Sequence, residues 1–246
     1  MEDDRLKMIA EIALERNFVG DAMLCAGRHE EALRHFSTAL KEAEGSLGPG
    51  HVATLNAVYG IACSLQFLGT NEALPLYMRA HSGLEEALGP DHRDTTRAEN
   101  GLGTTLQDLG RPVEACEHLL NAAVAMLKDP GLSCHDTFRV MGNLGYALMG
   151  TGDHLAAELV LRRSVSGLTG LLGSDDIGTK QYEIGQMIAE SMISDGIRAP
   201  FPSGRVLPPD DPRAVRLARK LEAALNEMRR LDPEFPLLFY NDFSGE

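Results

Sequence analysis

The sequence predicts an all-α fold of about ten helices, an α-solenoid of stacked antiparallel helical hairpins. Three observations predict it. Aromatic residues make up only 5% of the 246 residues and Trp is absent, which disfavours a β-sandwich. Apolar residues recur at three- and four-residue spacing, the pattern of amphipathic helices. A pattern of turns and small residues also repeats about every 42 residues, which is typical of repeat proteins.

The turns give the period of the repeat. The string LGPGH at 47–51 recurs as LGPDH at 88–92, and weaker versions follow near residues 130 and 173. In the LGP turns the proline breaks the preceding helix, because it has no N–H. Each turn is followed by a threonine, and Thr or Asp there is expected to cap the next helix. The four threonines are Thr54, Thr95, Thr137 and Thr179.

A second set of markers lies inside each copy. An anchor glycine (Gly27, Gly69, Gly110 or Gly152) is expected to end the first helix in the left-handed conformation. Seven residues earlier is a small residue that lets two helices approach closely: Gly20, Ala62, Gly103 or Gly145. A large apolar residue follows on the second helix: Phe36, Tyr77, Leu119 or Leu161. One hairpin cannot bury its own apolar face, so the copies must stack.

The segments GRHEEALRHFSTALKEAEGSLGPGH and ALPLYMRAHSGLEEALGPDHRDT resemble the tetratricopeptide repeat, in its 42-residue kinesin-light-chain-like form. The resemblance covers about residues 10–175, in repeats at about 10–50, 51–91, 92–134 and 135–175. It implies a right-handed solenoid and a scaffold for protein–protein contacts. The sequence departs from the pattern by one residue missing after Gly69 and an insertion around 131–134.

The remaining chain divides into four parts. A helix at 175–195 is expected to begin a degenerate fifth repeat, which completes a solenoid over residues 1–195. A Pro- and Gly-rich loop at 196–212 follows, then a basic amphipathic helix at 213–231. We interpret that helix as a cap for the solenoid; a membrane-surface helix and a calmodulin-type target are the alternatives. We interpret the acidic, aromatic tail at 232–246 as a tether or a packed terminus. The alternative is a segment that contacts the groove or a partner through Phe235, Phe239 and Tyr240.

The first helices of such repeats line a concave groove, and their polar residues are the candidate site. These are Asn17, Asp21, Asn56, Tyr59, Arg97, Asn100, Thr104, Arg139, Asn143 and Tyr146. Asn side chains both donate and accept hydrogen bonds, which suits the backbone of an extended peptide. The resemblance implies this role most directly for Asn100 and Asn143. Arg97 and Arg139 hold equivalent positions and are candidates for binding an acidic ligand.

Composition excludes several other classes. A net charge of −13 disfavours nucleic-acid binding, and no apolar run is long enough to span a membrane. The start MEDDRLKM predicts no signal peptide, and four scattered cysteines indicate the cytoplasm or another reducing compartment. His51, His92 and His135 fall on successive turns, too far apart to share a zinc ion. No catalytic motif or cofactor-binding motif is found.

We therefore expect a non-enzymatic adaptor or scaffold that holds a protein or peptide in its groove. A fixed accessory subunit of a large assembly is the second hypothesis. An enzyme with a small-molecule pocket in the solenoid is the third, because ordinary polar residues can build such a pocket without a motif.

Overall fold

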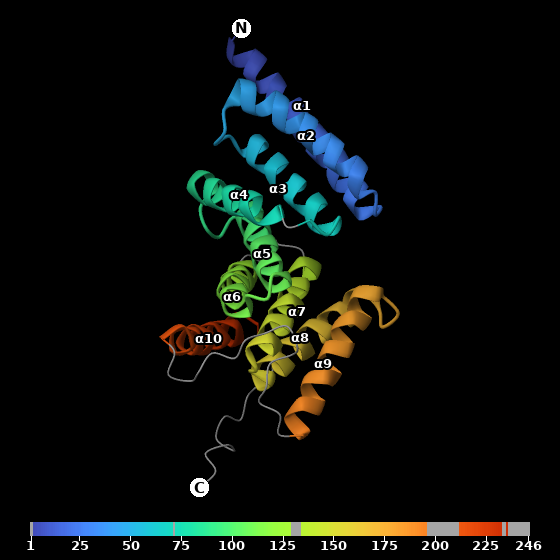
Figure 1. Ribbon diagram of the computed structural model, residues 1–246, viewed down its shortest axis with the longest axis vertical. Helices are drawn as coiled ribbons and strands as arrows, with labels where there is room; N and C mark the ends of the chain where they lie inside the picture. The colour runs from blue at the N-terminus through green and yellow to red at the C-terminus, as the bar shows by residue number, and fades with distance from the viewer. Residues whose placement is uncertain (1, 71, 129–133, 196–211, 233–234, 236–246) are drawn as a thin grey trace. The chain divides into compact units, whose positions relative to one another are not determined.

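The computed structural model describes residues 2–70, 72–128, 134–195, 212–232 and 235 (Figure 1). These residues form ten helices and no strands. The chain separates into two compact units, residues 1–105 and 106–246. The helices are α1 (Glu2–Cys25), α2 (His29–Leu47), α3 (Val52–Phe67), α4 (Ala73–Leu88), α5 (Arg93–Asp108), α6 (Pro112–Lys128), α7 (Cys134–Thr151), α8 (His154–Leu172), α9 (Ile177–Ser194) and α10 (Pro212–Leu231).

Helices adjacent in sequence pack as pairs, which confirms the predicted hairpins. In the first unit α1 packs on α2, α2 on α3 and α3 on α4, and α1 also contacts α3. In the second unit α6 packs on α7, α7 on α8 and α8 on α9. Each hairpin turns at an anchor glycine with positive φ, such as Gly27 at 71° and Gly69 at 73°. A side chain would be strained in that conformation, so the repeated glycine is required by the turn.

The predicted large residues of the second helices form the core. Phe36, Tyr77, Leu119 and Leu161 are each at most 2% exposed. Phe36 shows why small residues face them: a Cβ added to Gly20 or Gly60 would lie 2.6 or 2.3 Å from its ring. The aromatic ring thus holds together its own hairpin and the first helix of the next copy. The helices pack closely through small residues, so the core is filled with few aromatic side chains.

The first-helix caps differ in part from expectation. His51 Nδ1 accepts a hydrogen bond from the Ala53 N–H at 3.2 Å, and His92 Nδ1 accepts one from the Asp94 N–H. The buried Thr54 hydroxyl instead donates to the Gly48 carbonyl at 2.9 Å and fastens the turn. The recurring histidines of α3 and α5 are therefore the caps, while an aspartate, Asp176, caps α9 as expected.

Helix α10 lies on α6 within the second unit (Figure 1). Its apolar stripe of Leu217, Leu221, Leu225 and Met228 is buried. The interpretation of α10 as a cap for the solenoid stays a prediction. None of the described helices has the length and apolar character needed to cross a bilayer.

Candidate functional site

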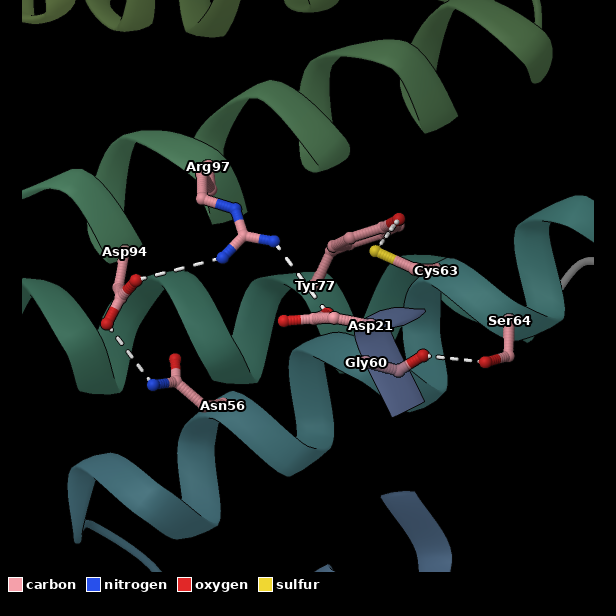
Figure 2. A network of polar contacts seen from close by, with 8 residues as sticks. All are labelled: Asp21, Asn56, Gly60, Cys63, Ser64, Tyr77, Asp94 and Arg97. Atoms are coloured by element: carbon pink, nitrogen blue, oxygen red, sulfur yellow. Dashed lines mark hydrogen bonds and ion pairs between the residues drawn. The ribbon is translucent and has the colours of Figure 1, made fainter. Parts of the chain in front are cut away.

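Three successive first helices of the first unit bring polar side chains to one face. Arg97 of α5 lies with its guanidinium 5.1 Å from the centre of the Tyr59 ring of α3. The Arg97 terminal nitrogens also lie 3.9 Å from Asp21 of α1 and 4.0 Å from Asp94. Figure 2 shows Asn56 beside this group, donating to the Asp94 carboxylate at 3.2 Å. We call Asp21, Asn56, Tyr59, Asp94 and Arg97 the first-helix face.

The packing of the helices explains why these residues share a face. Gly60 and Gly101 are pressed against the Phe36 and Tyr77 rings, which fixes the buried side of α3 and α5. Residues three or four positions apart lie on one side of a helix. Asn56 and Tyr59 therefore lie together on α3, with Arg97 of α5 reaching over Tyr59 toward α1.

The charges of the first-helix face are nearly balanced within it. Burial raises the pKa of the Asp21 carboxyl, and Arg97 offsets part of that rise. The pKa of Arg97 is itself raised, by its electrostatic interaction with Tyr59 and then by Asp21, so the guanidinium stays charged. The Arg97 side chain is 32% exposed and that of Asp21 41% exposed. The face thus presents a fixed cation–aromatic pair with acids beside it.

A second layer of hydrogen bonds supports this face from beneath. Figure 2 shows the Tyr77 hydroxyl beside Cys63 Sγ, 3.2 Å away. The same hydroxyl donates to Gln66 Oε1 at 2.8 Å. Gln66 in turn donates to the Thr104 hydroxyl of α5 at 3.3 Å. Burial raises the pKa of the Cys63 thiol, which keeps it protonated. The layer positions α3 against α5 and offers no activated nucleophile.

Asn17 lies beneath the first-helix face and is not part of it. Its side chain is 6% exposed, and its amide donates to the Ala53 carbonyl at 3.1 Å. It therefore joins α1 to α3 beneath the face. Asn100 is half-buried on α5.

The predicted residues of α7 form a separate group in the second unit. Asn143 accepts a hydrogen bond from the Tyr182 hydroxyl of α9 at 2.9 Å, and the Tyr146 hydroxyl donates to the Gln181 carbonyl. Arg139 has an exposed side chain, and its carbonyl accepts from Tyr182 at 3.3 Å. The Asn143 and Tyr146 side chains and the Arg139 carbonyl therefore join α7 to α9.

Of the predicted tail contacts, Phe235 is 4% exposed and packs within the second unit. Phe239 and Tyr240 lie outside the described residues.

Sequence reasoning missed two contributors. Asp94 could have been found from the repeat pattern, because Asp136 holds the same position in the next copy. No such pattern marks Tyr182: its ring fills the notch at Gly142, where a Cβ would lie 2.3 Å from it, and only the packing of α9 reveals this. The described residues contain no group of three or more His, Cys, Asp or Glu side chains placed to hold a metal ion.

The paired helices and the polar face of first helices define a helical-repeat protein of the α-solenoid class. Residues 10–86 match the family model of the tetratricopeptide repeat. This match bears out the predicted resemblance to the tetratricopeptide repeat, and the likenesses in fold given next agree with its kinesin-light-chain-like form.

The fold is similar to that of a Podosopora anserina protein described as kinesin light chain with nearly identical TPR-like repeats. The TM-score is 0.58 at 16% identity, over 90% of this chain and 98% of that one. A variant of that protein with one residue replaced gives 0.58 at 15% identity, with the same coverage. BtubC (BKLC) from P. vanneervenii gives 0.57 at 18% identity, over 65% of each chain. No curated protein matches the sequence.

Proposed function

We propose that this chain is a non-catalytic adaptor that binds an extended peptide segment of a partner protein on the first-helix face. The meeting of Arg97, Tyr59 and Asp21 from three successive first helices supports it most strongly. A surface built from three helices, with a rigid cation–aromatic platform, suits a ligand that runs across the helices. Asn56 and Arg97 supply hydrogen-bond donors for peptide carbonyls.

The proposal does not require an acidic ligand. Asp21 and Asp94 already lie within 4.0 Å of Arg97, so a ligand carboxylate would compete with both. A peptide carbonyl accepts from the guanidinium without introducing a third negative charge. We therefore expect recognition through backbone hydrogen bonds and an apolar side chain resting on Tyr59 and Arg97.

A selected peptide that carries a photo-crosslinker tests this proposal. Linear peptides are selected from a random library on the full chain, and the best binder is resynthesised with benzoylphenylalanine at successive positions. Mass spectrometry of the crosslinked protein should place the attachment points on α1, α3 and α5. Crosslinks confined to the second helices α2 and α4 would exclude the first-helix face.

A fixed accessory subunit of a larger complex is the second candidate, because large apolar side chains are exposed. On α9, Ile177, Ile184 and Met187 lie at helical spacing and are 85%, 58% and 66% exposed. Exposed apolar clusters are typical of permanent interfaces. Such a subunit should co-purify in fixed stoichiometry through a high-salt wash, whereas a peptide adaptor should release its partner and stay monodisperse.

A further inference from the structure

The outer side of α10 is basic in a chain whose net charge is −13. Its first nine residues, 212–220, include Arg213, Arg216, Arg219 and Lys220 and no acidic residue. All four side chains are exposed. We call these four residues the basic strip.

The basic strip belongs to a helix whose apolar face is already occupied. Leu217, Leu221 and Leu225 are each at most 6% exposed, in a helix that packs on α6. A membrane-surface helix must insert an apolar face into lipid, and a calmodulin target must offer one to a groove. Docked α10 has its leucine stripe buried and presents mainly charged side chains, with Val215 partly exposed among them.

Two acidic side chains of α6 face the basic strip: Glu114 interacts electrostatically with Arg213, and Glu117 contacts two other cations. Glu117 accepts from Arg216 Nε at 2.9 Å and lies 3.7 Å from Lys220 Nζ. The Arg216 side chain remains 60% exposed and that of Lys220 45% exposed. Because four cations face two carboxylates of α6, the strip keeps an excess of positive charge, and the Glu117 contacts hold it in a defined position.

We infer that the basic strip binds an acidic, extended segment of a partner protein, at a site separate from the first-helix face. Arg213, Arg216 and Lys220 follow one another at about one helical turn, or roughly 5.4 Å. Alternate side chains of an extended peptide lie about 7 Å apart on one side. Acidic residues at every second position can therefore meet successive cations. A strip this short in an acidic chain does not suit a nucleic acid, which needs a broad basic surface.

Fluorescence anisotropy with the full chain tests this inference. The probe is a labelled eight-residue peptide alternating Glu and Ser, compared with its Gln–Ser counterpart. The acidic peptide should bind at low salt and weaken as salt rises, and the neutral peptide should not bind. The variant Arg216→Gln/Arg219→Gln/Lys220→Gln should bind about tenfold more weakly, since three partly exposed charges are lost.

Two further variants separate binding from folding. Arg219→Glu leaves both Glu117 contacts in place, so it should weaken binding with α10 still docked. The matched control Arg230→Gln removes an exposed cation at the far end of α10, where Arg230 pairs with Glu227, and should bind as wild type. Equal affinity of wild type and the triple variant would overturn the inference. Tighter binding of a short DNA duplex or of anionic vesicles than of the acidic peptide would overturn it too.

Discussion

Arg163 and Asp232 form a buried ion pair across 69 residues of sequence. The Asp232 carboxylate accepts from Arg163 Nε at 2.6 Å and from a terminal nitrogen at 3.2 Å. The side chains are 10% and 9% exposed, and the guanidinium lies 4.8 Å from the Phe138 ring centre. The contact joins α8 to the residue that follows α10.

Removing one partner of this pair should destabilise the second unit. Asp232→Asn leaves the Arg163 guanidinium buried without its counter-charge, at a cost of about 3 kcal/mol. Urea unfolding should show that loss, and in limited proteolysis α10 of the variant should be cleaved faster than α10 of the wild type. Glu227→Gln, which breaks the exposed pair with Arg230, is the matched control and should leave the midpoint unchanged. A midpoint unchanged by Asp232→Asn would mean that the pair does not hold the helix.

Two glycines of the first unit should respond oppositely to alanine. Gly101→Ala places a Cβ 2.2 Å from the Tyr77 ring, so the helices must separate and stability should fall by about 2 kcal/mol. Gly45 of α2 has open space around its Cβ position, and Gly45→Ala should stabilise by about 0.5–1 kcal/mol. Thermal unfolding of both variants measures the difference. If Gly101→Ala were neutral, the close approach of α4 and α5 would be disproved.

The cysteines should differ in reactivity with iodoacetamide. Cys25 is exposed, whereas Cys63 and Cys116 are buried. Burial raises the pKa of both buried thiols, so the reactive thiolate is scarce in the folded protein even at pH 8. Mass spectrometry should find rapid alkylation at Cys25, with Cys63 and Cys116 modified only after urea is added. Equal rates at Cys25 and Cys116 in the native protein would contradict this packing.

Tyr182 should make stability depend on pH in the alkaline range. Burial raises its pKa from 10 to about 12, so the fold favours the neutral phenol. The unfolded chain therefore loses this proton first, and stability should fall between about pH 10 and 12. Tyr182→Phe removes the hydrogen bond to Asn143, so its free energy of unfolding at pH 7 should be about 1 kcal/mol lower. Its stability should also lack the part of the alkaline decline that Tyr182 causes. If wild type and Tyr182→Phe lost stability identically with pH, the buried Tyr182 hydroxyl would not be the cause of the decline.

The repeat could be predicted from sequence because its markers are forced by backbone and packing. Gly27 and Gly69 are required because the backbone there is left-handed. Gly20 and Gly60 are required because the Phe36 ring packs directly against them. These requirements recur in every copy, so they appear as a period. The helix caps were less predictable, since the imidazole of His51 can accept the same hydrogen bond as a threonine hydroxyl.

The candidate site was only partly predictable. Periodicity shows which residues share a face of a helix, but not which side chains of other helices they contact. Asn56, Tyr59 and Arg97 do lie together. Asn17 occupies a first-helix position as well, yet it points beneath the face to the Ala53 carbonyl. The place of α10 on α6 also depends on tertiary contacts such as that of Arg216 with Glu117, which are 99 residues apart.

The central claim is that the first-helix face binds a partner peptide, and titration calorimetry tests it most directly. Two variants make the same chemical change: Arg97→Gln on the face, and Arg34→Gln on the exposed side of the second helix α2. With the library-selected peptide, Arg97→Gln should weaken affinity at least about tenfold, through loss of a charged hydrogen bond and of the Tyr59 stack. Arg34→Gln should bind as wild type. Equal affinity for all three proteins would contradict the claim.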